Sequence, residues 1–252
     1  MRLDLFLVEH KFFDSRTKAQ KAIEAEAIRV NGTIITKSNY EVDEFAPVEI
    51  EIIKNTNPYV SRGGLKLEAA IDNFKLDFCD KKVLDIGSST GGFTDCALKH
   101  GASLVYAVDV GTNQLDASLR GRKDIVLLEQ TNILEVEDFP VDFDYIVMDV
   151  SFISIEKVLP VVERFLKEDA TFICLIKPQF ELGKRYMKNG IVKDRNLHIK
   201  VLEHIIAVLE EYHMGILKLI PSPILGGSGN KEFLACIRKN VNTRVNVIEV
   251  CK

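Results

Sequence analysis

The chain has 252 residues, and 46% of them are hydrophobic, which is ample for the core of a globular protein. Its formal net charge of −4, from 33 basic and 37 acidic residues, excludes a protein that is basic throughout. Any contact with nucleic acid must therefore come from a local patch of positive charge. Residues 1–40 can supply one, because they hold seven basic and five acidic side chains.

The cysteines and the N-terminus indicate the compartment. Five cysteines lie far apart, without the Cys-x-x-Cys spacing of zinc or redox sites, which favours a reducing compartment. The stretch MRLDLFLVEH carries acidic residues in its short apolar run, unlike a signal peptide, and no run approaches the roughly 18 apolar residues of a membrane span. The five histidines lack metal-binding spacing. We therefore expect a cytoplasmic protein with no bound metal and no membrane partner.

Residues 1–53 have the pattern of a small α+β domain. Ser15 is a suitable N-cap for a helix with the sequence RTKAQKAIEAEA. The stretch IRVNGTIIT predicts a β-hairpin that turns at Asn31-Gly32, and YEVDEFAPVEIEII adds a further strand. Residues 54–64, KNTNPYVSRGG, are polar and carry one proline and two glycines, as linkers do. We expect the second domain to occupy residues 65–252.

The second domain alternates strands with helices. Five runs predict strands, each followed by a helix except for the short third connection: VLDIG, SLVYAVDVG, DIVLLEQ, YIVMDVS and TFICLIK. This alternation indicates an α/β, Rossmann-like fold with a doubly wound parallel sheet. The last two runs, GILKLIPSPI and EFLACIRK, predict a C-terminal β-hairpin.

Ligands of such sheets bind beyond the carboxyl ends of the strands, where the first strand continues into GSSTGGF. Its three glycines permit a tight turn and a close approach of the backbone to a ligand, and their spacing suits a ligand without a pyrophosphate. Asp109 can accept both hydroxyls of a ribose, and Asn132 follows the third strand near the expected adenine. These residues predict S-adenosylmethionine as the cofactor. The binding residues that this pattern indicates are Gly87, Gly91, Gly92, Asp109 and Asn132.

Two charged residues end the fourth and fifth strands. Asp149 follows the run YIVM, and Lys177 ends the run TFICLIK. Neighbouring parallel strands lie about 4.8 Å apart, so these two side chains can meet in one cleft. A lysine at the end of a buried strand is costly unless something there needs its charge. The adjacent aspartate and nucleoside site therefore favour a catalytic role for Lys177 over a lysine that merely reaches the surface.

Six segments together resemble the TlyA family of rRNA 2′-O-methyltransferases, which is related to the FtsJ (RrmJ) enzymes. They are SRGGLKL, DIGSSTGGFTD, AVDVG, MDVSFIS, LIKPQFELG and GSGNKEF, and the resemblance covers nearly the whole chain. It implies a catalytic tetrad of Lys66, Asp149, Lys177 and Glu232, an N-terminal RNA-binding module of ribosomal-protein type, and a linker near Tyr59–Arg62 that couples the domains. It also implies that the loop binding S-adenosylmethionine consists of Gly87, Ser88, Ser89, Thr90, Gly91, Gly92 and Phe93. The implied reaction is methylation of a cytidine ribose in ribosomal RNA, in the first place 23S rRNA of the large subunit.

The residues of the implied tetrad suit this chemistry. A ribose 2′-hydroxyl is a weak nucleophile until its proton leaves, whereas a sulfonium methyl is already a strong electrophile. Lys177 could act as the base, or stay charged and stabilise the developing alkoxide, and the sequence leaves both roles open. Asp149 is assigned to the sulfonium side and to orienting Lys177, with Lys66 and Glu232 holding that geometry.

Basic residues outside the tetrad are candidates for contacts with RNA phosphates. Four of them surround the predicted N-terminal helix and hairpin, and the fifth lies in the expected linker. They are Arg16, Lys18, Lys21, Arg29 and Arg62.

Three other functions fit parts of the sequence. An RNA-binding ribosome assembly factor with vestigial activity would not need an intact set of four polar residues. A nicotinamide-dependent oxidoreductase could use the same sheet. Some members of the family are labelled haemolysins, but a membrane-lytic protein would need a spanning or long basic amphipathic segment. Activity on the small ribosomal subunit is not expected, since the chain ends soon after its last strand, without the further C-terminal helix of longer relatives.

Overall fold

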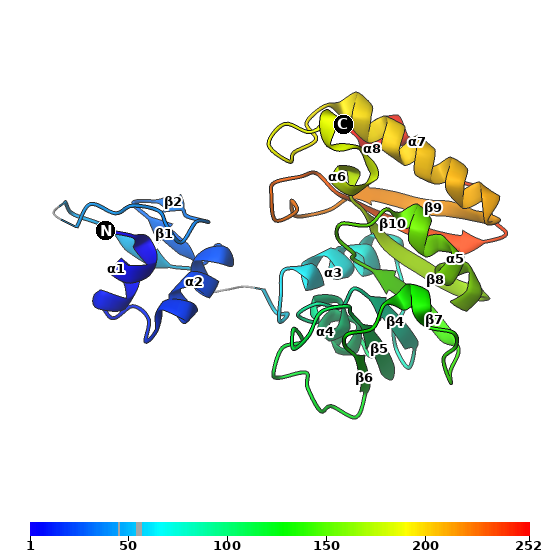
Figure 1. Ribbon diagram of the computed structural model, residues 1–252, viewed down its shortest axis with the longest axis horizontal. Helices are drawn as coiled ribbons and strands as arrows, with labels where there is room; N and C mark the ends of the chain where they lie inside the picture. Colours follow the sequence, from blue (N-terminus) through cyan, green and yellow to red (C-terminus); the bar gives the residue numbers. More distant parts are fainter. Residues whose placement is uncertain (45, 54–56) are drawn as a thin grey trace. The chain divides into compact units, whose positions relative to one another are not determined.

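Figure 1 shows the computed structural model, which describes residues 1–44, 46–53 and 57–252. The chain divides into two compact units, Met1–Pro58 and Tyr59–Lys252, each with its own hydrophobic core. Residues 54–56 of the expected linker lie outside the described residues.

The N-terminal unit is a small antiparallel sheet with two helices. Its elements, with the strands in the order β2-β1-β3, are α1 (Leu3–Glu9), α2 (Arg16–Glu24), β1 (Ile28–Val30), β2 (Thr33–Ile34) and β3 (Ile50–Ile52). The predicted N-cap is confirmed, because the Ser15 hydroxyl accepts a hydrogen bond from a backbone N–H of the first turn of α2. The predicted hairpin is confirmed as well. Val30 pairs with Thr33 across Asn31 and Gly32, whose φ angles of 47° and 78° fit a two-residue turn.

The larger unit is built on a seven-stranded sheet in the order β6-β5-β4-β7-β8-β10-β9. Its strands are β4 (Lys82–Ile86), β5 (Leu104–Val108), β6 (Ile125–Leu128), β7 (Phe143–Met148), β8 (Leu166–Ile176), β9 (Met214–Pro221) and β10 (Phe233–Lys239). Strands β4 to β8 pair in parallel, whereas β10 pairs antiparallel with both β8 and β9. This is the doubly wound sheet with a C-terminal β-hairpin that the sequence predicts.

Helices cover both faces of this sheet (Figure 1). They are α3 (Gly63–Phe74), α4 (Gly92–Lys99), α5 (Ile155–Phe165), α6 (Pro178–Glu181), α7 (Arg195–Glu211) and α8 (Val247–Val250), with short 3₁₀ turns at Ile133–Glu135 and Lys184–Tyr186. Successive side chains of a strand point to opposite faces, so Val83 packs with α3 and α4 while Leu84 packs with α5 and α7. The central strands are therefore buried on both sides, which explains their nearly continuous apolar sequences.

The connection between β5 and β6 corrects one expectation. We predicted a helix there, but residues 109–124 form turns and bends. The Glu129 carboxylate accepts hydrogen bonds from the backbone N–H groups of Gln114 and Leu115. In a helix, these N–H groups would instead point along the helix axis. Positive φ angles at Asn113 and Gly121 also break the helical path. The third connection is short, as predicted, and holds only a 3₁₀ turn.

Within the described ranges, no helix is both long enough and apolar enough to cross a membrane.

Candidate active site

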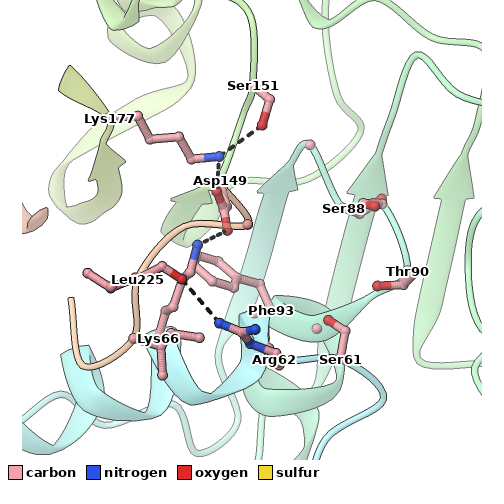
Figure 2. A pocket seen from close by; sticks show the side chains of 16 residues that line it. Ser61, Arg62, Lys66, Ser88, Thr90, Phe93, Asp149, Ser151, Lys177 and Leu225 are labelled. Atoms are coloured by element: carbon pink, nitrogen blue, oxygen red, sulfur yellow. Dashed lines mark hydrogen bonds and ion pairs between the residues drawn. The ribbon is translucent and has the colours of Figure 1, made fainter. Parts of the chain in front are cut away.

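Four charged side chains from distant parts of the chain meet at the carboxyl edge of the parallel strands. Lys66 lies in the first turns of α3, Asp149 directly follows β7, and Lys177 directly follows β8. Glu232 precedes β10, whose residue Phe233 pairs with the last residue of β8, so the antiparallel register places Glu232 opposite Lys177. Figure 2 shows Lys66 and Lys177 directed at Asp149 from two sides.

Ion pairs join the four residues into one cluster. The Lys177 ammonium lies 2.6 Å from Asp149 Oδ1 and donates a hydrogen bond of 2.9 Å to Ser151 Oγ. The Lys66 ammonium donates to Asp149 Oδ2 at 3.2 Å and to Glu232 Oε2 at 3.0 Å. Lys66, Lys177 and Glu232 are each less than 9% exposed, so their charges would be costly if unpaired. Two cations and two carboxylates balance, which explains how a buried strand can end on a lysine.

Two cavities of about 350 and 400 Å³ open beside this cluster and share Gly87, Ser89, Asp149 and Ser151 as lining residues. The first is polar and contains Lys66 and Lys177. The second contains the two residues expected at the ribose and adenine, within apolar surroundings. Its lining includes Asp109, Asn132, Ile86, Val108, Ile133 and Val158. The arrangement offers an apolar chamber for a nucleobase next to a charged chamber for chemistry.

The loop after β4 fits S-adenosylmethionine. Gly87 has a φ of +81°, and a Cβ there would lie 3.0 Å from the Val150 side chain, so only glycine is accommodated without strain. Ser88 is 5% exposed, lines the first cavity, and its hydroxyl has no hydrogen-bond partner among the described protein atoms. A hydroxyl buried in this way calls for a polar ligand group. Gly91 lines neither of the two cavities; a Cβ there would come within 2.7 Å of Leu115 and Leu119.

Asp109 and Asn132 also hold the backbone that surrounds the second cavity. Asp109 accepts hydrogen bonds from the backbone N–H groups of Ser89, at 2.8 Å, and Gly111, at 2.7 Å. It thereby ties the glycine loop to the end of β5. The Asn132 side chain caps the following 3₁₀ turn by accepting from the Leu134 N–H at 3.2 Å. Both residues keep further lone pairs for a ligand.

Comparisons with known proteins show what the chain is similar to. The chain matches the FtsJ-like methyltransferase family over residues 59–239 and the S4 domain family over residues 1–48. A 16S/23S rRNA (cytidine-2′-O)-methyltransferase TlyA from Mycobacterium tuberculosis is 35% identical over 94% of this chain and 89% of its own length. A 23S rRNA (cytidine-2′-O)-methyltransferase TlyA from Campylobacter jejuni is 34% identical over 95% of this chain and 100% of its own length.

This chain belongs to the TlyA family of FtsJ-like methyltransferases. A solved structure of a candidate hemolysin from Streptococcus thermophilus has a similar fold, with a TM-score of 0.79 at 38% identity over 100% of this chain and 94% of that one. The protein is thus an S-adenosylmethionine-dependent methyltransferase with an N-terminal S4 domain. We refer to Tyr59–Lys252 as the methyltransferase unit and to Met1–Pro58 as the S4 unit.

Asp85 was not among the residues expected at the site, and it lies inside β4, just before the glycine loop of residues 87–93. Its side chain is fully buried and accepts a 2.6 Å hydrogen bond from Thr94 Oγ1, while Oδ1 has no partner among the described protein atoms. Burial raises the pKa of Asp85 to about 7. The hydrogen bond from Thr94 lowers this pKa, and the nearby negative charge of Asp149 raises it further. An acid within the apolar run VLDI is the signal that could have revealed it.

Phe152 was also overlooked. It lines the second cavity, is 90% exposed, and has a φ of 66°, which is rare for a bulky residue. Its ring packs against Phe180 with the centroids 5.0 Å apart. Nearby, the Glu181 carboxylate accepts hydrogen bonds from Ser154 Oγ and the Ile155 N–H, so the loops after β7 and β8 are tied together. An exposed aromatic ring beside the cluster offers a stacking surface.

Three of the five basic residues expected to contact RNA make internal ion pairs. Arg16 Nε lies 2.8 Å from Asp4, Lys18 pairs with Asp14 at 2.8 Å, and Arg29 pairs with Glu51 at 2.6 Å. For Lys21 the described residues provide no such pair. Arg62 lies in the methyltransferase unit, lines the first cavity, and donates to the carbonyl of Leu225 at 3.1 Å (Figure 2).

Asp4 organises one side of the S4 unit. Its side chain is fully buried and accepts hydrogen bonds from Arg2, Arg16 and Gln20. Burial alone would raise the pKa of Asp4, but these hydrogen bonds outweigh it and hold the pKa well below its usual range. Two guanidinium groups are thus fixed at the surface by one buried carboxylate.

In the parts of the chain that the structure describes, no group of three or more His, Cys, Asp and Glu side chains is placed to hold a metal ion.

Proposed function

We propose that this protein methylates the 2′-hydroxyl of a cytidine in ribosomal RNA, with 23S rRNA as the first target. The observation that carries the proposal is the cluster of Lys66, Asp149, Lys177 and Glu232 between the two cavities. It provides two buried cations where an alkoxide would form, beside a loop that fits S-adenosylmethionine. Their contacts support the roles assigned to these four residues, and those roles are part of the proposal.

The chain's own residues would position the 2′-hydroxyl. Lys177 would either take its proton as a neutral amine or, as an ammonium, stabilise the alkoxide that forms when the proton leaves. Lys177 is held from two sides, by Asp149 at 2.6 Å and Ser151 at 2.9 Å, so its ammonium nitrogen has a fixed place in the polar cavity. Lys66 holds the second oxygen of Asp149, which keeps that carboxylate oriented. S-adenosylmethionine would supply the activated methyl group, and the fixed positions of Lys66, Asp149 and Lys177 would orient the hydroxyl for the transfer.

Two features support RNA as the substrate. S4 domains and the rRNA methyltransferases named above point to ribosomal RNA as the partner of this chain. The exposed ring of Phe152 next to the cluster can stack on an unpaired base, which is how proteins commonly hold single-stranded RNA. Both TlyA relatives are named for methylation of 23S rRNA, and only the one from Mycobacterium tuberculosis is named for 16S rRNA as well, so we propose 23S rRNA first.

Transfer of labelled methyl groups from S-adenosylmethionine to separated ribosomal subunits tests this proposal. After digestion to nucleosides, we expect the label in 2′-O-methylcytidine from the large subunit. Label in a base-methylated nucleoside would contradict the proposed chemistry, and label only in the small subunit would contradict the proposed target. A variant without residues 1–58 should fold, because the methyltransferase unit has its own core, but it should lose most of the transfer to RNA.

A further inference from the structure

Gln179 closes the charged cluster into a ring. Its amide Nε2 donates a 2.9 Å hydrogen bond to Glu232 Oε1, while Lys66 binds the other oxygen of the same carboxylate. Gln179 stands two positions after Lys177, at the start of α6. The contacts therefore run from Lys177 through Asp149, Lys66 and Glu232 to Gln179, and from there along the chain back to Lys177.

The surroundings of the Gln179 side chain are unusual for a residue that only fills space. Its Oε1 is buried and has no hydrogen-bond partner among the described protein atoms. Burying an unpaired amide oxygen is unfavourable, and an apolar side chain of similar size would avoid this cost. What glutamine adds at this position is the N–H group that it donates to Glu232.

We propose that Gln179 is a positioning residue of the methyl transfer, acting through Glu232 on Lys66 and Asp149. This inference rests on the proposed function and deepens it. Glu232 is 2% exposed, so each of its oxygens needs a partner. With Gln179 and Lys66 each binding one oxygen, the carboxylate engages Lys66 through Oε2 alone.

Removal of the Gln179 amide would change how the Lys66 ammonium divides its hydrogen bonds between Asp149 and Glu232. Glu232 would then hold a buried oxygen without a donor, and the Lys66 ammonium is the nearest cation available to it. Lys66 would move toward Glu232 and away from Asp149, which it reaches at 3.2 Å, the longer of its two contacts. Asp149 would in turn lose one of the two cations that orient it, and the position of Lys177 would become less defined.

Two substitutions separate this role from a general loss of packing. Gln179→Met keeps the length of the side chain but removes the donor, and we expect kcat to fall about 10- to 100-fold, as for a lost hydrogen bond to a charged group. KM for ribosomal RNA and the Kd for S-adenosylmethionine should stay within about threefold of wild type.

Gln179→Glu adds a titratable group that can replace the amide only when protonated. The groups whose charges it would meet are Glu232, Lys66, Asp149 and Lys177. Two carboxyl groups that share one site titrate with one strongly raised pKa. The ratio of variant to wild-type kcat should therefore be highest near pH 6 and fall as the pH rises to 9. Asn73→Asp makes the same amide-to-carboxyl change at the exposed end of α3, and its ratio should stay constant over this range.

NMR of lysine side chains labelled with ¹³C at the ε position reports the environment of the Lys66 ammonium directly and does not depend on catalytic turnover. We expect the Lys66 ε-carbon resonance to shift in Gln179→Met and to keep its wild-type position in Asn73→Asp. An unshifted Lys66 resonance, a kcat of Gln179→Met within twofold of wild type, or a pH-independent ratio for Gln179→Glu would each overturn the proposal. If the wild-type protein itself methylates no ribosomal RNA, the proposed function fails, and the resonance alone then decides on the contact.

Discussion

Lys66 and Glu232 are separated by 166 positions in the chain, yet their charged groups lie 3.0 Å apart. Neither residue belongs to the alternating strands and helices that carry the cofactor loop. Lys66 lies in α3, the first helix of the methyltransferase unit, and Glu232 lies in the C-terminal hairpin, just before β10. The candidate active site therefore forms only when both ends of this unit are folded onto the central strands.

Lys177→Ala should abolish methyl transfer while the affinity for S-adenosylmethionine stays within a few fold of wild type. The ammonium lies in the polar cavity between Asp149 and Ser151, away from the residues of the apolar cavity that suit the adenosine. Calorimetry and single-turnover transfer measure the two quantities separately. A parallel loss of binding and rate would remove Lys177 from its assigned role.

Asp109→Ala should weaken S-adenosylmethionine binding by roughly 1.5 to 3 kcal/mol, the range for hydrogen bonds that involve a charged group. The substitution removes the acceptor expected at the ribose and also frees the N–H groups of Ser89 and Gly111. Asp142→Ala, at the opposite edge of the sheet, is the matched control. An unchanged Kd for Asp109→Ala, measured by calorimetry, would exclude Asp109 from the site.

Asp85 should make the methyltransferase unit less stable as the pH rises from about 4 to 7. Its pKa in the folded protein is about 7, above the roughly 3.9 of an unfolded chain, so the folded state holds a proton that the unfolded state releases in this interval. The linked loss amounts to at most about 4 kcal/mol. Asp85→Asn should flatten the pH dependence of the free energy of unfolding, measured by denaturant titration. Identical slopes for both proteins would show that Asp85 does not take up a proton on folding.

Asp4→Ala should destabilise the S4 unit by about 1 to 3 kcal/mol at neutral pH, because Arg2, Arg16 and Gln20 lose their shared acceptor. The pKa of Asp4 is held low in the folded unit, so its contribution is present above about pH 4 and is lost as the pH falls toward that lowered value. Hydrogen exchange of the S4 unit at pH 7 and pH 3 measures this. Asp14→Ala, which breaks an exposed pair, should leave exchange nearly unchanged. Equal protection in Asp4→Ala and wild type at pH 7 would refute this role for Asp4.

Lys18→Ala combined with Lys21→Ala should weaken RNA binding and flatten its salt dependence by up to about 0.7 to 0.9 in log–log slope per lost phosphate contact. This pair leaves the contact between Arg16 and Asp4 intact, so the S4 unit stays folded. Lys82→Ala combined with Lys167→Ala removes the same charge at the starts of β4 and β8, far from the carboxyl edge. If both double variants bind with the same slope, Lys18 and Lys21 form an ordinary solvated helix face.

Those parts of the site that end regular strands could be predicted from sequence. Asp149 and Lys177 follow apolar runs of parallel strands, and strand ends meet at one edge by simple geometry. The placement of Lys66 and Glu232 next to them was implied only by resemblance to a family, because it depends on the pairing of Phe233 with Ile176 and on the docking of α3. Local sequence patterns do not specify such long-range contacts.

Side-chain pairing was the least predictable feature. The sequence indicates that Arg16 is a cation on an exposed helix face, but its guanidinium binds Asp4. Asp4 is buried only because α1 packs against α2. The prediction of a helix after β5 was wrong for a similar reason. Glu129, which directly follows β6, accepts hydrogen bonds from the backbone N–H groups of Gln114 and Leu115 in that segment. Glu129 lies too far along the sequence for a local pattern to predict this contact.

We propose that the Lys66–Asp149–Lys177–Glu232 cluster directs a methyl group to a cytidine 2′-hydroxyl of ribosomal RNA. The most direct test is to map 2′-O-methyl groups on both ribosomal RNAs from cells that express either the wild-type protein or Lys177→Ala. We predict one cytidine of 23S rRNA that carries the modification with the wild-type protein and lacks it with the variant. Identical maps from the two strains would show that Lys177 is not needed for methylation of ribosomal RNA.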